Sequence, residues 1–168
     1  MRSSGAKLTL VSLLVILTAV GAAWVLAWAT PEAEGNPGED WSPTLEQGRL
    51  PGFEDANVNN DGRYFFYQIC KAVEFSRPDA PGNVLIENTT GNAFDMRVEY
   101  ESEEYGVVYR SPVLQPDTHL LRDRLSEELP EGTYPVTANV YVLDPETGGE
   151  EEVFKEKIEL RVKKPFFG

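Results

Sequence analysis

The residues best spaced to do chemistry lie just before the first apolar run of the C-terminal part. Asn57, Asn59 and Asp61 occupy alternate positions, and Gly62 follows them. Calcium loops of the EF-hand type place Asp or Asn at such positions, then Gly, and later a bidentate Glu. Here Asn replaces the first acid and Gln68 stands in the place of the Glu. We therefore expect a plain Asn/Asp/Gly turn, with a weak calcium loop as the alternative.

Cys70 and His119 are the only cysteine and the only histidine of the chain. A Cys/His zinc site needs several converging ligands, so one residue of each type nearly excludes it. Cys70 lies in the apolar run YFFYQIC, where a thiol usually behaves as a small buried hydrophobe. An intermolecular disulfide is the alternative, because one cysteine cannot form a disulfide within the chain. We expect no cofactor and no metal.

Acidic side chains are abundant, but none is placed as a catalytic pair. Glutamates cluster at 99–104, 127–131 and 150–152. A glycosidase needs two carboxylates held at a fixed separation, and nothing marks such a pair here. Glutamates that alternate along a strand are better explained as its solvent-facing side. The sequence motifs of serine hydrolases, phosphate-binding loops and zinc proteases are also absent, so we predict that the protein is not an enzyme.

An uncharged apolar run of 22 residues, Leu8 to Ala29, follows a short basic N-terminus. As an α-helix it would be roughly 33 Å long, about the thickness of the hydrocarbon core of a membrane. Trp24 and Trp28 lie one turn apart near its outer end, where indole rings favour the membrane–water interface. Because Arg2 and Lys7 precede the run, the positive-inside rule predicts a cytoplasmic N-terminus and an extracellular C-terminal part at the plasma membrane.

The same run also fits a cleaved signal peptide. Residues 1–7 would be its basic region, and Ala27-Trp28-Ala29 matches the small-x-small cleavage pattern. The apolar run is longer than the usual core of such peptides, about 7–15 residues, so we predict an uncleaved transmembrane helix at 8–29 behind a cytoplasmic tail at 1–7. Both interpretations export the rest of the chain, and they differ in whether it stays tethered.

The exported part is strongly acidic. All 28 Asp and Glu residues and 13 of the 15 Lys and Arg residues follow residue 30, which gives this part a formal charge of −15. Such a surface repels nucleic acid and anionic lipid headgroups, so neither is an expected ligand. It favours solubility and attracts cations or basic partners.

An acidic spacer is predicted directly after the membrane segment. Residues 30–62 are rich in Pro, Gly, Glu and Asn and show no convincing periodicity, which is typical of an extended linker. Four large apolar residues interrupt this composition and are expected to pack back on the domain, with contact to a partner as the alternative. They are Trp41, Leu45, Leu50 and Phe53.

A strand-rich domain is predicted at 63–163, with a tail at 164–168. Short apolar runs alternate there with Gly, Pro, Asn and Asp turns. The expected strands are 64–69, 72–75, 83–88, 93–101, 107–110, 133–143 and 153–162. Thr118–Leu129 stays ambiguous, because its leucines approximate a helical spacing. About seven strands in about 100 residues predict an all-β fold, specifically an immunoglobulin-like β-sandwich without the antibody disulfide.

Period-two alternation predicts which side of two strands is buried. In 93–101 the side expected to face the core consists of Phe94, Met96, Val98 and Tyr100. The side expected to face solvent consists of Asp95, Arg97 and Glu99. In 133–143 the residues that share one face are Tyr134, Val136, Ala138, Val140 and Val142.

Three motifs follow one another along the domain. The first is GN-x-x-IEN, carried by Gly82, Asn83, Ile86, Glu87 and Asn88. The second is S-x-x-L-x-P, carried by Ser111, Leu114 and Pro116. The third is LP-x-G-x-Y, carried by Leu129, Pro130, Gly132 and Tyr134. As an ordered set over about 60% of the chain, they resemble small, poorly characterised surface proteins of Gram-positive bacteria. The resemblance implies an N-terminal membrane anchor, a spacer and a β-sandwich ectodomain, and it implies no catalytic or ligand residues.

These features predict a single-pass, membrane-anchored extracellular protein that acts as a non-enzymatic protein-interaction or envelope-scaffolding module. The expected partners are the membrane, through the helix, and an unidentified protein of the cell envelope. One alternative is a carbohydrate- or calcium-binding surface domain, motivated by the acidity, the aromatic residues and the 57–62 loop. Another is a secreted inhibitor, which requires cleavage after Ala29.

Overall fold

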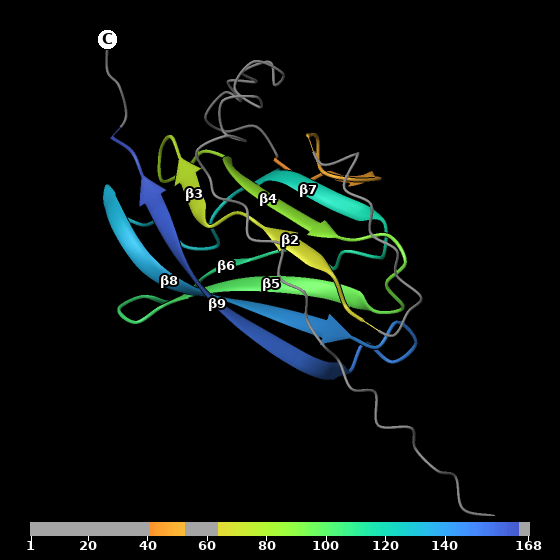
Figure 1. Cartoon of the computed structure of the whole chain (residues 1–168). Helices are drawn as coiled ribbons and strands as arrows, with labels where there is room; N and C mark the ends of the chain where they lie inside the picture. Colours follow the sequence, from red (N-terminus) through yellow and green to blue (C-terminus); the bar gives the residue numbers. More distant parts are fainter. Residues whose placement is uncertain (1–40, 53–63, 165–168) are drawn as a thin grey trace, which may run out of the picture.

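The computed structural model describes residues 41–52 and 64–164, and these form strands, turns and loops without any helix (Figure 1). The strands are β1 (Leu45–Gln47), β2 (Tyr67–Ile69), β3 (Ala72–Phe75), β4 (Gly82–Asn88), β5 (Asp95–Ser102), β6 (Gly106–Arg110), β7 (Thr118–Asp123), β8 (Gly132–Leu143) and β9 (Glu150–Val162). The predicted all-β class is confirmed. Each of the seven predicted strands overlaps an observed one, and β1 and β7 are additional.

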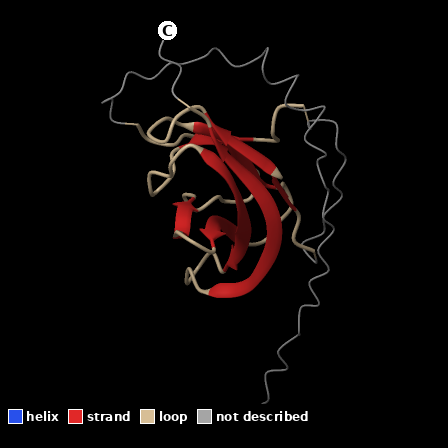
Figure 2. Cartoon of the chain, turned by 90° about the vertical axis from the view of Figure 1, so that its left-hand side faces the viewer, coloured by secondary structure: helices blue, strands red, loops and turns tan. Residues whose placement is uncertain are grey.

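The strands form one mixed sheet, and β3 joins its two halves. The order is β1-β7-β4-β3-β9-β8-β5-β6, with β2 paired to β4 beside this path. β3 is antiparallel to β4 at the pair Glu74–Asn83, and it runs parallel to β9 along the whole of Ala72–Phe75. The sheet curls, as the strong curvature of its longest strands shows (Figure 2). The curl lets the two halves share one apolar core.

The predicted alternation builds this core. Met96, Val98 and Tyr100 of β5 are fully buried, and the even-numbered residues of β8 from Val136 to Val142 are at most 4% exposed. These two strands pair in register, so their apolar faces form one continuous surface. Removing that surface from water is the main stabilising contribution to such a fold.

The ambiguous stretch 118–129 begins with a strand, β7, and contains no helix. Leu120 lies opposite Ile86 of β4, and both side chains are fully buried in the core. The neighbouring residue, His119, points to the other face, as expected for a strand. Pairing with β4 on one side and β1 on the other satisfies the backbone of β7, so tertiary hydrogen bonding outweighs the helical spacing of the leucines.

Part of the predicted spacer lies on the sheet. β1 pairs with β7 in antiparallel register, and the segment 41–52 continues beyond it on both sides. Leu50 is 2% exposed, as expected for a residue that packs back, whereas Leu45 is 38% exposed. Trp41 is half-buried and lies beside two arginines of the β7 region. Phe53 lies outside the described residues.

Candidate interaction face

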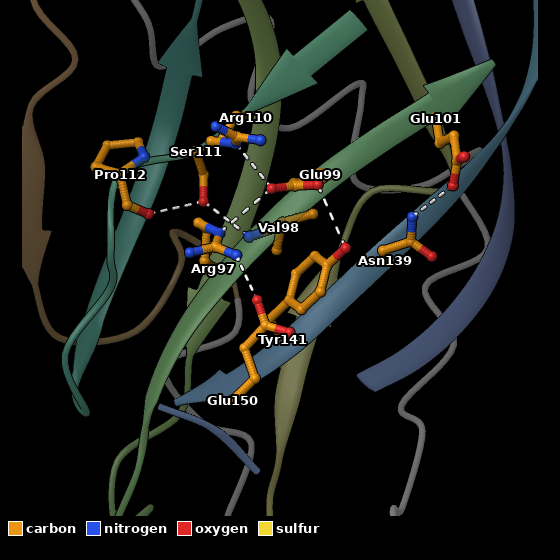
Figure 3. Close-up of polar contacts among 10 residues, drawn as sticks. All are labelled: Arg97, Val98, Glu99, Glu101, Arg110, Ser111, Pro112, Asn139, Tyr141 and Glu150. Carbon is orange, nitrogen blue, oxygen red and sulfur yellow. Dashed lines mark hydrogen bonds and ion pairs between the residues drawn. The ribbon is translucent and has the colours of Figure 1, made fainter. Parts of the chain in front are cut away.

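The candidate site is a polar network on the outer face of β6, β5 and β8 (Figure 3). Because apolar side chains of β5 point into the core, the intervening residues Arg97, Glu99 and Glu101 point outward. The strand register then sets their neighbours. Glu99 lies opposite Arg110 of β6 on one side and Asn139 of β8 on the other.

Glu99 is the centre of this network. Its carboxylate accepts a hydrogen bond from Arg110 Nε at 2.7 Å and another from the Tyr141 hydroxyl at 3.3 Å. Arg97 Nε lies 3.4 Å from the same carboxylate. The expectation that Glu99 faces solvent is wrong, since the residue is only 5% exposed. The two guanidinium groups and the phenol cover it, and their charges and hydrogen bonds compensate the lost hydration.

Arg97 is held in place by Glu99 and by two further neighbours, Tyr141 and Glu150. Its guanidinium carbon lies 4.8 Å from the centre of the Tyr141 ring, a cation–π geometry. Its Nη2 donates a 3.0 Å hydrogen bond to Glu150, the first residue of β9. Burial and the negative charge of Glu99 raise the pKa of Tyr141, so its hydroxyl remains a donor to Glu99 at neutral pH. The face therefore presents a fixed arginine and a fixed tyrosine.

Asn139 of β8 lies opposite Glu99 and forms a second polar pair on the same face, with Glu101 of β5, and the sequence interpretation missed it. Its Nδ2 donates a 3.0 Å hydrogen bond to Glu101, and the residue is 3% exposed. Its buried Oδ1 has no hydrogen-bond partner in the part of the chain that the structure describes. The available signal was a polar residue at an outward position of a strand whose other face is entirely apolar.

A shallow groove continues the face at one end of the network. It has a volume of about 310 Å³, and Glu101, Thr137 and Lys157 line it together with the β5–β6 turn. Tyr105 in that turn is 40% exposed, and its ring meets Tyr134 edge-on at 5.7 Å. Tyrosine is enriched in protein interfaces whereas Lys and Glu are depleted, so the two tyrosines are the part of this end of the face that resembles a contact surface.

The residues singled out for metal chemistry do not come together. Asn57, Asn59 and Asp61 lie outside the described residues, while Gln68 is buried in β2. Within residues 41–52 and 64–164, no three His, Cys, Asp or Glu side chains are placed to hold a metal ion.

Cys70 and His119 are structural in this arrangement. Cys70 packs half-buried against the core, its thiol donates a 3.0 Å hydrogen bond to the carbonyl oxygen of Ala72, and burial raises its pKa. A raised pKa lowers the thiolate fraction, so this cysteine is a poor nucleophile. His119 is buried in β7, where its Nδ1–H donates a 3.0 Å hydrogen bond to the carbonyl oxygen of Gly48.

The predicted membrane segment, with Trp24 and Trp28, also lies outside the described residues. In the ranges that are described, no helix is long and apolar enough to span a membrane.

Residues of the first two ordered motifs have clear structural roles. Asn88 donates hydrogen bonds to the carbonyl oxygens of Phe94 and Leu114, at 3.0 and 2.9 Å. Ser111 Oγ accepts a 2.9 Å hydrogen bond from the amide of Val98. These contacts tie the end of β4 to the residue before β5 and to the chain after β6, and they tie that chain to β5.

Comparison of the chain with protein-family models, with curated proteins and with solved structures found no match.

Proposed function

We propose that the protein is a single-pass membrane protein whose extracellular β domain binds another protein of the cell envelope and has no catalytic activity of its own. The N-terminus lies in the cytoplasm, and residues 8–29 span the plasma membrane. The uncharged length of this segment, its basic flank and its outer tryptophans support the anchor. Residues 30–40 then connect the membrane to the described domain.

We further propose that the domain is an immunoglobulin-like sandwich. Its N-terminal strand region is split between the two halves of the sheet, since β2 pairs with β4 and β3 runs parallel to β9. Tyr134, at the start of β8, donates a 2.8 Å hydrogen bond to the carbonyl oxygen of Pro130. A tyrosine that bonds back to the backbone near the start of the penultimate strand is characteristic of this architecture.

The observation that carries the proposed binding role is the buried position of Glu99 on an outward sheet face. A solvated strand face needs no such arrangement, and exposed ion pairs contribute little to stability. Here the carboxylate orders Arg97 and Tyr141, two residue types that dominate binding energy in protein interfaces. Side chains that are ordered in advance lose less entropy on binding, which favours a specific contact.

Cross-linking in native membranes tests this proposal. The full-length chain would carry a photo-reactive residue at exposed Val153, beside Tyr141 in the sheet register, and cross-linked partners would be identified by mass. We expect one dominant envelope protein, and its yield should fall at least about tenfold in the Arg97→Ala/Tyr141→Ala variant.

The matched control is Arg77→Ala/Tyr64→Ala, which removes the same residue types outside the network. Its cross-linking yield should equal that of the wild type. Equal yields from both double variants would exclude the network as the binding surface.

Fractionation tests the anchor separately. Native protein should remain in the membrane fraction at alkaline pH and have the mass of the complete chain. A chain beginning at Thr30 in the medium would overturn the anchor and favour a secreted domain.

A further inference from the structure

We propose that residues 41–52 form a latch that shields the peptide bond after Arg49 from proteolysis, so that the latch must open before a trypsin-like protease can release the domain. The biological consequence depends on the proposed membrane anchor, because only a tethered domain can be shed. The shielding itself depends only on contacts within residues 41–52 and 64–164.

The first contact of the latch is its strand. β1 adds to the free edge of β7 through the pairs Leu45–Leu120, Glu46–His119 and Gln47–Thr118. Directly after it, the Gly48 amide donates a 2.8 Å hydrogen bond to the carbonyl oxygen of Asp117. Gly48 has φ +93°, a conformation that glycine adopts without the cost of a Cβ. The chain can therefore turn from the edge of the sheet over the outer face of β4.

The second contact is the buried carboxylate of Glu87 in β4. It is fully buried, accepts a 2.9 Å hydrogen bond from the amide of Leu50 and forms an ion pair with Arg49 Nε. The Arg49 side chain is 11% exposed and Leu50 is 2% exposed. Glu87 thus holds the residues on both sides of one peptide bond against the sheet.

The third contact is Trp41 at the membrane-side end. The guanidinium carbons of Arg122 and Arg124 lie 5.9 and 6.0 Å from the centre of its ring system. Cation–π contacts of this kind are individually modest, but they fix the point at which the chain reaches the domain. The latch is therefore held at both ends and in the middle.

The contacts of the latch lie on the outer face of the sheet, opposite the apolar core. Leu120 and Ile86 belong to the core cluster, whereas His119 and Glu87 next to them point to the outer face. All three β1 residues are exposed, so the large apolar side chains that the latch buries are Leu50, which lies outside the core cluster, and half-buried Trp41. Segments with few buried apolar contacts open at lower free energy than the whole domain unfolds. The latch can consequently open while the sheet stays folded.

Cleavage after Arg49 can be used to detect the opening of the latch. Arg49 is the only Lys or Arg between Lys7 and Arg63, so trypsin has one cleavage bond there. A protease must bind the arginine side chain in its own pocket, and that side chain is held by Glu87 when the latch is closed. Cleavage at this bond therefore requires opening.

The test uses the full chain in detergent, in an Arg63→Gln background that removes the next tryptic bond. Trace trypsin is added, and formation of the 50–168 fragment is followed by mass. We expect slow cleavage in this background and at least about tenfold faster cleavage after Glu87→Gln, because the buried ion pair is lost. The control Glu127→Gln changes an exposed glutamate and should leave the rate unchanged.

A second variant separates latch opening from general unfolding. Trp41→Ala removes a contact at the end of the latch without touching Glu87, and it should also accelerate cleavage while the thermal midpoint of the domain stays within a few degrees. Equal cleavage rates for all variants, or a rate equal to that of the denatured chain, would overturn the latch. If the 50–168 fragment forms as expected but the chain was never membrane-bound, the latch stands and only the anchor fails.

Discussion

Replacing Glu99 by glutamine tests whether the negative charge at the centre of the polar network stabilises the fold. Glutamine keeps the size of the side chain but removes the negative charge that Arg110, Arg97 and Tyr141 surround. The two guanidinium groups would then face each other without compensation. We expect a loss of stability, because a buried carboxylate with three partners is replaced by a neutral group that can satisfy only part of them.

The expected loss of unfolding free energy can be worked out from how exposed the partners of Glu99 are. The Arg110 side chain is 60% exposed, so solvent screens its ion pair, and we assign it about 0.5 kcal/mol. Arg97 is 25% exposed and the Tyr141 hydroxyl bonds to the same buried group, so each contributes about 0.5–1 kcal/mol. The total is about 2 kcal/mol, which corresponds to a thermal midpoint lower by roughly 6–10 °C for a domain of this size.

Urea unfolding of the full chain in detergent, followed by tryptophan and tyrosine fluorescence, measures this difference. Glu101→Gln is the matched control, because Glu101 lies on the same face of the same strand but is exposed and accepts one hydrogen bond, from Asn139. The control should change the free energy of unfolding by less than about 0.5 kcal/mol. If Glu99→Gln and Glu101→Gln have equal effects, Glu99 has no special role and the reasoning is refuted.

Three further substitutions have defined outcomes. Asn88→Ala removes three hydrogen bonds of a fully buried side chain and should cost about 3 kcal/mol in urea unfolding, whereas exposed Asn83 on the same strand should tolerate alanine within about 0.5 kcal/mol. Gly82→Ala would place a Cβ 2.6 Å from a backbone oxygen and against the ring of Phe75, so calorimetry should show a loss of about 1–3 kcal/mol. Burial raises the pKa of Asp123, so its favourable contribution is complete below the ordinary carboxyl pKa and is lost as the pH rises through the raised value. The stability of the wild type relative to Asp123→Asn should therefore fall as the pH rises above the ordinary carboxyl pKa of about 4, and a constant difference would contradict this assignment.

The sequence alone determined seven of the nine strands that the structure describes and the apolar, core-facing side of the two strands with the clearest alternation. Alternation of apolar and polar residues is a local property with the period of the β backbone, so Met96, Val98 and Tyr100 could be placed in the core without any knowledge of their neighbours. The turns were equally visible, because Gly, Pro, Asn and Asp favour the backbone conformations that turns require. Composition likewise indicated the acidity of the chain after residue 30.

The tertiary structure decided what lies beside each strand, and with it the site and the latch. Glu99 meets Tyr141, 42 residues away, and Glu87 meets Arg49, 38 residues away. Their burial depends on strand order and register, which no local pattern encodes. The same long-range pairing made a strand of Thr118–Asp123 and recruited Leu45–Gln47 from the predicted spacer, because the free edge of β7 offered hydrogen-bond partners that an isolated segment lacks.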